Sequence, residues 1–262
     1  MSVISQPARR LAQPQSLRAL FFDVGYTLLA PFPSTVDIVA QVCAERGQPV
    51  SRACLEEHLP AAELGLRGRV RRAPQTWADD HAIKAIWQAY FTELLGACLD
   101  PAAPEFAATV EAARQAYEHH TSYDVFPDVV PVLRLLHARG LTMGVISDWD
   151  TGLGGMLNAH GLNRYFDFAV VSATLRHAKP DPRLFDTALR RADAIPDYAL
   201  HIGDNYVLDV LGARAAGIQA VLIDRPGTVD PADVDVPVVR DLYGLLDLLE
   251  LESPAVDEVG GG

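Results

Sequence analysis

The sequence predicts an α/β fold, a Rossmann-like doubly wound parallel sheet with an inserted all-helical cap domain. Three observations predict it. Five short runs are apolar at nearly every position, which is typical of strands buried on both faces of a parallel sheet. Helical patterns separate the last four runs, as expected when strands and helices alternate. The long stretch between the first two runs shows helical periodicity and no convincing strand.

The five apolar runs have strand length and are rich in β-branched and aromatic residues. They are residues 19–22, 141–146, 168–171, 199–202 and 220–223. Between them, residues 128–139 carry regularly spaced Val and Leu and end at Gly140, which suits a helix C-cap. Residues 182–191 open with a proline, and residues 207–216 are followed by Gly217, so both segments are also predicted to be helices.

The insert is predicted to hold several helices. Ser34 can cap the first, and residues 51–66, 75–95 and 104–119 predict three more. We therefore expect a core domain over 17–31 and 123–252, and a cap over 32–122 hinged near 29–33 and 123–127. The terminal segments 1–16 and 253–262 are expected to be disordered. A run of arginines at 67–72 is expected to be a solvated loop.

Composition limits the classes of function. The chain has 262 residues and a formal net charge of −12, which disfavours nucleic acid as a partner. No apolar run approaches the roughly 18–20 residues that span a bilayer, so we expect no membrane association and a cytoplasmic protein. The three cysteines show no CxxC spacing, and we expect reduced, buried thiols rather than a disulfide. Nothing in the sequence indicates an oligomeric state.

Polar residues follow the predicted strands at the edge where ligands bind in such sheets. Asp23 ends the first run, Ser147 and Asp148 end the second, and Asp204 ends the fourth. Taken singly, each is more often a helix cap or a turn residue. Together with Lys179, however, they would place clustered acids, a hydroxyl and a lysine at one edge. Such acids repel one another unless a cation such as Mg²⁺ lies among them, and the lysine and hydroxyl can hold a phosphoryl group.

Four segments resemble the motifs of the haloacid dehalogenase superfamily, in the right order. They are residues 21–28 (Phe-Phe-Asp-Val-Gly-Tyr-Thr-Leu), 146–150 (Ile-Ser-Asp-Trp-Asp), 179–185 (Lys-Pro-Asp-Pro-Arg-Leu-Phe) and 201–209 (His-Ile-Gly-Asp-Asn-Tyr-Val-Leu-Asp). The resemblance covers about residues 17–225. Motifs three and four are especially similar to the branch of this family known as hydrolase domain-containing 3 or rhythmically-expressed-gene-2-like. The helical insert is similar to the cap domain of the family.

The resemblance implies a role for each motif residue in a Mg²⁺-dependent hydrolase acting on a small phosphorylated substrate. Asp23 would be the nucleophile and form an aspartyl-phosphate. The Mg²⁺ ligands would be Asp23, Asp204 and the carbonyl of Gly25. Ser147 and Lys179 would hold the phosphoryl group, and Thr27 and Asp148 would make further contacts with the substrate. Asp209 would orient Lys179 or a metal-bound water, and the Thr27 hydroxyl would also support the loop of the first motif.

One departure from the family pattern affects catalysis. Phosphatases of this superfamily carry an Asp two residues after the nucleophile, and here that residue is Gly25. General acid–base help, worth about 10²–10⁴-fold, is therefore expected to be weakened. The substitutes considered are Tyr26, Asp148 and His177, and the sequence does not choose among them.

Three functions remain open on sequence grounds. They are a phosphatase for substrates with good leaving groups, a catalytically reduced domain that binds Mg²⁺ and a phosphometabolite or protein partner, and a hydrolase of carbon–halogen or carbon–phosphorus bonds. Asp204 disfavours the third, because a metal-independent dehalogenase would not need it. Lys84 is a weak candidate for a Schiff base. The aromatic residues Trp77, Trp87 and Tyr90 either read the leaving group or form the core of the cap.

Overall fold

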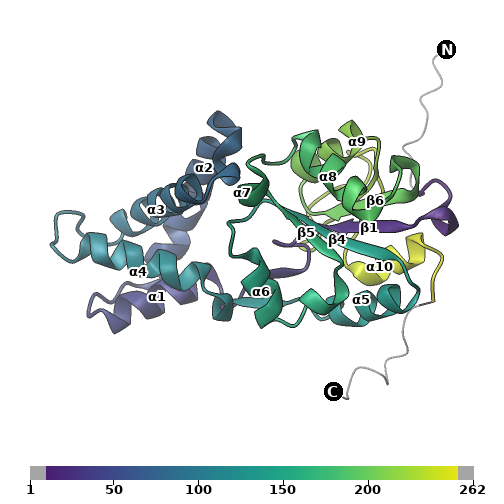
Figure 1. Cartoon of the computed structure of the whole chain (residues 1–262). Coiled ribbons are helices and arrows are strands. Elements are labelled where there is room, and N and C mark those ends of the chain that lie inside the picture. Colours follow the sequence, from purple (N-terminus) through teal and green to yellow (C-terminus); the bar gives the residue numbers. More distant parts are fainter. Residues whose placement is uncertain (1–9, 253–262) are drawn as a thin grey trace, which may run out of the picture.

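The computed structural model describes residues 10–252 and confirms the predicted fold class (Figure 1). A six-stranded sheet has the order β5-β4-β1-β6-β7-β8, and every neighbouring pair is parallel. The strands are β1 (Ala19–Phe22), β4 (Thr142–Ser147), β5 (Phe168–Val171), β6 (Ala199–Gly203), β7 (Gln219–Ile223) and β8 (Val238–Val239). The chain runs from β1 to one side of the sheet and later returns to its other side. The carboxyl end of β1 therefore lies at the switch point where ligands bind in such folds.

Helices cover both faces of this sheet (Figure 1). One face packs against α5 (Val129–Ala138), α6 (Leu153–Ala159) and α10 (Leu242–Leu248) through a large apolar cluster. The other face packs against α8 (Pro182–Ala192), the π-helical stretch η6 (Tyr206–Leu211) and α9 (Gly212–Ala215). A short helix, α7 (Ser172–Leu175), follows β5. Because both faces are covered, the strands are mostly apolar, as the sequence pattern predicts.

The insert between β1 and β4 is helical and has its own apolar core. It contains α1 (Thr35–Glu45), α2 (Arg52–Arg72), the 3-10 turn η2 (Pro74–Ala78), α3 (Asp80–Gly96) and α4 (Phe106–Glu118). The Ser34 side chain accepts a hydrogen bond from the Asp37 amide and so caps α1 as expected. This insert lies to one side of the sheet and its covering helices (Figure 1).

A two-stranded antiparallel ribbon joins the insert to the core. Its strands are β2 (Leu29–Pro31) and β3 (Tyr123–Val125). Neither segment was expected to be a strand, because three residues are too few to show a periodic pattern. Both chain crossings therefore run side by side and are hydrogen-bonded to each other.

Three expectations from the sequence are corrected by the structure. The arginine run at 67–72 is the last part of α2, where Arg67 pairs with Glu63 and Arg69 pairs with Glu93. Basic residues suit the C-terminal turn of a helix because they face its negative dipole end. Part of the expected N-terminal disordered segment is ordered, since the Ala12 amide and carbonyl both bind the Gln219 side chain. The remaining parts of the expected disordered termini, 1–9 and 253–262, lie outside the described residues.

The third correction concerns the cysteines. Cys54 near the start of α2 and Cys98 just after α3 form a disulfide with a Cα–Cα distance of 6.0 Å, and only Cys43 is a free, buried thiol. The two bonded residues are 44 positions apart, so no local spacing reveals the pairing. The expectation of three reduced thiols is therefore wrong, and the cysteines give no support for a reduced compartment. Among residues 10–252, no helix is long and apolar enough to cross a membrane.

Candidate active site

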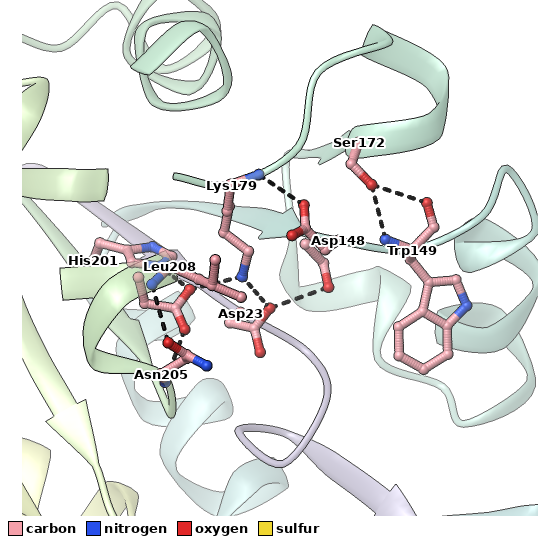
Figure 2. A network of polar contacts seen from close by, with 10 residues as sticks. Asp23, Asp148, Trp149, Ser172, Lys179, His201, Asn205 and Leu208 are labelled. Carbon is pink, nitrogen blue, oxygen red and sulfur yellow. Dashed lines mark hydrogen bonds and ion pairs between the residues drawn. The ribbon is translucent and has the colours of Figure 1, made fainter. Parts of the chain in front are cut away.

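A buried charge network lies at the carboxyl ends of β1, β4 and β6 (Figure 2). Lys179 Nζ donates hydrogen bonds to Asp23 Oδ1 at 2.6 Å and to Asp209 Oδ1 at 2.7 Å. Ser147 Oγ donates to the same Asp23 oxygen at 3.1 Å. The four side chains come from four separate motifs and are all almost fully buried. No hydrogen bond from the described residues reaches Asp23 Oδ2, so this oxygen is left free to react or to bind a cation.

Asp209 is held by more partners than Asp23. Its Oδ1 bonds to His201 Nε2 at 2.9 Å as well as to Lys179, and its Oδ2 accepts the Asn205 amide hydrogen at 3.0 Å. Gly203 is needed beside it, because a Cβ there would stand 2.2 Å from Asp209 Cγ. With both oxygens engaged, Asp209 is suited to orienting Lys179 rather than to binding a ligand itself.

The charged side chains of this network shift one another's pKa values and so determine which of them are ionised. Burial alone would lower the pKa of Lys179, but the carboxylates of Asp209 and Asp23 raise it well above its usual value, so the ammonium stays charged. Burial alone would raise the pKa of Asp209, but Lys179 and His201 lower it. For Asp23, burial outweighs the attraction of Lys179 and the pKa is raised.

Asp204 lies beside this network on the loop after β6. Oxygens of Asp23, Asp204 and Asp209 all come within 4.8 Å of one another. Asp204 is exposed overall, yet partial desolvation of its carboxyl, followed by the charges of Asp23 and Asp209, raises its pKa to about 8. A cluster of carboxylates that resists ionisation is stabilised by a cation, and oxygen donors suit Mg²⁺. Since Asp209 is saturated, Asp23 and Asp204 are the side chains that fit such an ion.

A cavity of about 530 Å³ extends from this network toward the cap. Asp23, Gly25, Ser147, Asp148, Lys179 and Asp204 all line it, so the structure brings together most residues that the sequence singled out. On its cap side lie Trp77, Trp87 and Tyr90. Thr27 is not among the lining residues.

Thr27 supports the loop of the first motif in a different way than expected. Its buried hydroxyl has no hydrogen-bond partner in the described part of the chain. Its carbonyl instead accepts two hydrogen bonds from the Arg225 guanidinium, which also forms a double interaction with Asp128. Arg225 lies 3.7 Å above the ring of Phe126, next to the ribbon. The loop is therefore fixed by an arginine that no sequence motif singled out.

No side chain fills the position of the missing acid at Gly25, and the indole ring of Trp149 borders it. Gly25 has no positive φ, and a Cβ there would lie 3.7 Å from Trp149 Cζ3, which is ordinary contact. A longer side chain would share this space with the indole. The left-handed residue of the loop is its neighbour Tyr26, with φ of 55°.

The structure separates the three candidate substitutes for the acid. Tyr26 and Asp148 line the cavity, whereas His177 is not among the lining residues and lies 3.8 Å from Asp181. Asp148 Oδ1 accepts the Lys179 amide hydrogen, and its Oδ2 is buried without a partner among the described residues. Burial raises the pKa of Asp148 to about 7.

The cap touches the core at a second place besides the ribbon. Asp80 at the start of α3 accepts hydrogen bonds from the amide and hydroxyl of Thr151 at 2.9 and 2.7 Å. Gln75 accepts the Ala178 amide hydrogen, one residue before Lys179. Ser172 Oγ donates to the Trp77 carbonyl. These contacts hold the cap against the loops that carry Asp148 and Lys179.

Comparison with known proteins agrees with this arrangement. The family model for haloacid dehalogenase-like hydrolases matches residues 17–217. The chain belongs to the haloacid dehalogenase-like hydrolase family. It is 36% identical over 157 residues to human haloacid dehalogenase-like hydrolase domain-containing protein 3, covering 57% of this chain and 62% of that protein. The match thus spans about three fifths of this relative's length.

Further relatives of this hydrolase include enzymes named for phosphatase activity. A phosphoserine phosphatase from Thermus thermophilus is 33% identical over 206 residues, covering 68% of this chain and 83% of the relative. Among solved structures, the magnesium-bound hydrolase YfnB from Bacillus subtilis has a TM-score of 0.71 at 18% identity, covering 90% and 99% of the two chains. The latter likeness supports the fold alone.

Proposed function

We propose that this hydrolase is a Mg²⁺-dependent phosphatase that forms an aspartyl-phosphate on Asp23. The observation that carries the proposal is the state of the Asp23 carboxylate, whose Oδ1 is bound by Lys179 and Ser147 while Oδ2 is free. This geometry fixes the nucleophile, and its attack brings the phosphoryl group next to one ammonium and one hydroxyl. The phosphatase names of several relatives point the same way.

The residues have separate tasks in the proposed reaction. Asp23 attacks phosphorus, and Ser147 Oγ and Lys179 Nζ hold the phosphoryl oxygens. Asp209 keeps Lys179 in place and charged. Asp23, Asp204 and the Gly25 carbonyl would hold Mg²⁺, which neutralises phosphoryl charge when bound. A water molecule then hydrolyses the aspartyl-phosphate and restores Asp23.

Gly25 limits the substrates that this site can use. Without a carboxyl at this position, a leaving alkoxide receives less protonation, whereas a phenolate or acyl leaving group needs none. We therefore expect kcat/KM, which reports the step in which the leaving group departs, to fall as the leaving-group pKa rises. Measuring kcat/KM for a series of aryl, acyl and alkyl phosphates with Mg²⁺ tests this, and a flat dependence would show that Asp148 or Tyr26 already donates the proton.

Restoring the acid gives the matched experiment. Gly25→Asp should raise alkyl-phosphate turnover by roughly 10²-fold, the lower end of general acid–base help. Since Trp149 abuts the position, the double variant Gly25→Asp with Trp149→Leu should gain at least as much. If neither wild type nor variants turn over any phosphate while Mg²⁺ binds, the chain is a binding domain. Halide release from 2-haloacids would instead favour a dehalogenase, a function named for one similar structure at 27% identity.

A further inference from the structure

The leaving-group half of the cavity is walled by aromatic rings. Trp77, Trp87, Tyr123 and Trp149 all line it and are only half-buried. Phe91 is fully buried in the apolar core of the cap and does not line the cavity, whereas Tyr90 and Tyr117 belong to that core and line the cavity as well. Packing of the cap core therefore explains why Phe91 is aromatic, but it does not explain why Trp77, Trp87, Tyr123 and Trp149 present ring surface to the cavity.

These rings form a continuous path toward the nucleophile. Trp87 lies 5.0 Å from Tyr117, Tyr117 lies 6.0 Å from Tyr123, and Tyr123 lies 5.7 Å from Trp149, measured between ring centroids. Trp149 in turn borders Gly25, two residues after Asp23. A flat group attached to a phosphate on Asp23 would thus meet ring faces and edges from its first atoms outward. Offset or edge contacts between rings add stability beyond area burial.

The charge of the lining limits what the flat group can carry. Seven carboxylate side chains but only two basic ones line the cavity. Lys179 is bound to Asp23 and Asp209. The other, Arg67, lies 3.5 Å from Glu63 with most of its side chain exposed. On the leaving-group side Glu63 pairs with Arg67 and Glu118 pairs with Arg114, while Asp150 has no ion-pair partner among the described residues. An anionic substituent there would meet no unpaired cation and would lie near an additional carboxylate, which disfavours its binding.

The glycine at position 25 restricts the leaving group in a third way, independent of the aromatic rings and of the lining charges. The absence of a carboxyl at this position favours leaving groups that depart without a proton. Among these, simple acyl groups such as acetyl leave without a proton but offer no ring, and alkyl groups satisfy neither condition. A phenolate satisfies both.

We propose that, if the site is the phosphatase described above, its substrate is a small aryl phosphate whose ring bears no negative charge. The bond from phosphorus to the ring oxygen breaks and its electron pair leaves with the phenolate, while an Asp23 oxygen bonds to phosphorus. Water then cleaves the aspartyl-phosphate to inorganic phosphate, and the proton that it releases to solvent balances the one the phenolate takes up. The ring is held by Trp87, Tyr123 and Trp149.

Two substrates of nearly equal shape test the role of charge in the wild-type chain. With saturating Mg²⁺, para-carboxyphenyl phosphate should show a KM about tenfold higher than para-carbamoylphenyl phosphate, because only the first carries a second anionic group. Acetyl phosphate, which has a good leaving group and no ring, should also show the higher KM. Equal KM values for the aryl pair, or a lower KM for acetyl phosphate, would overturn the inference.

A pair of variants tests the role of the rings. Trp87→Leu should raise the KM for para-carbamoylphenyl phosphate by about three- to tenfold, and by clearly more than it raises that for acetyl phosphate. Phe91→Leu removes a neighbouring ring from the same cap core without touching the cavity, and should change neither KM. Equal effects of the two variants would contradict the inference. Hydrolysis of acetyl phosphate alone would refute the aryl assignment and leave the phosphatase standing, whereas no turnover of any substrate would remove both.

Discussion

At the core end of the cavity, Asp23, Lys179 and Asp209 are bound to one another, whereas the cap end presents aromatic rings around carboxylates. The core end is thus fixed by charge pairing, and every member depends on its partners. The cap end is lined by rings that pack against one another, as Trp87 does against Trp77 and Tyr117, and none of these rings takes part in the charge pairing of the core end. A phosphatase handles the same phosphoryl group in every substrate, but its leaving group can differ. The separation suits such a reaction, because residues at the cap end can change without disturbing the charge network at the core end.

The largest effect should follow from breaking the charge pairing. Lys179→Met leaves two buried carboxylates without a cation, which we expect to lower the free energy of unfolding by about 3–5 kcal/mol. Lys84→Met is the matched control in a chain with only two lysines, since Lys84 is more than half exposed and pairs with Glu111 on the surface. It should change stability by less than about 0.5 kcal/mol. Urea unfolding of both variants at neutral pH measures the difference, and similar losses would show that the buried network is not what holds the core end.

The disulfide tests whether the cap end has its own stability. Cys54→Ser opens a loop of 44 residues within the cap and should cost about 2–4 kcal/mol. Cys43→Ser, which changes the free thiol in the same apolar core, controls for the loss of a sulfur atom. Thiol titration of the unfolded, unreduced chain should detect one thiol. Three thiols would contradict the pairing.

Asp204 tests the core end without breaking its pairing. Asp204→Asn should weaken Mg²⁺ binding at least about tenfold, because a neutral amide replaces one of the two carboxylates proposed to hold the ion. Its fold should be retained, since Asp204 is exposed and takes no part in the Lys179 network. Calorimetric titration with Mg²⁺ measures the affinity, and an unchanged value would remove the metal site from this position.

The smallest effect concerns a carboxyl on the cap side. Burial, against the attraction of Arg114, raises the pKa of Glu118 from 4.5 to about 7. The folded chain therefore keeps a proton that the unfolded chain loses, so stability falls as pH rises through about 4.5–7. Glu118→Gln cannot ionise, and it should gain about 1 kcal/mol over the wild type between pH 5 and pH 8. Unfolding at both pH values checks this, and a parallel pH dependence of the two proteins would show that Glu118 ionises normally.

Sequence pattern predicted the sheet well and the connections poorly. β1 and β5 match the predicted runs at both ends, because both strands are apolar throughout; β1 is buried at every position, whereas the edge strand β5 is partly exposed. Helix α6 begins with Leu153 followed by two glycines, which are poor helix formers, and tertiary packing of Leu153 and Leu157 decides its state instead. The ribbon depends on pairing between segments about 94 positions apart, which no local pattern contains.

The same distinction holds for the site. Residues with distinctive chemistry at strand ends, such as Asp23 and Ser147, could be placed at one edge from topology alone. His201 and Arg225 were not singled out, although a histidine inside an apolar strand was a usable signal. The contact of Trp149 with Gly25 depends on the path of a loop, which sequence periodicity does not describe.

Asp128 joins three segments that are far apart in the chain. Its carboxylate binds Arg225, which holds the Thr27 carbonyl, and it also accepts the Leu242 amide hydrogen at the start of α10. Thr27 and Arg225 are 198 positions apart, on opposite sides of the cap in the sequence. The loop beside the Asp23 carboxylate is therefore held in this way only when the core segments before and after the cap have folded together.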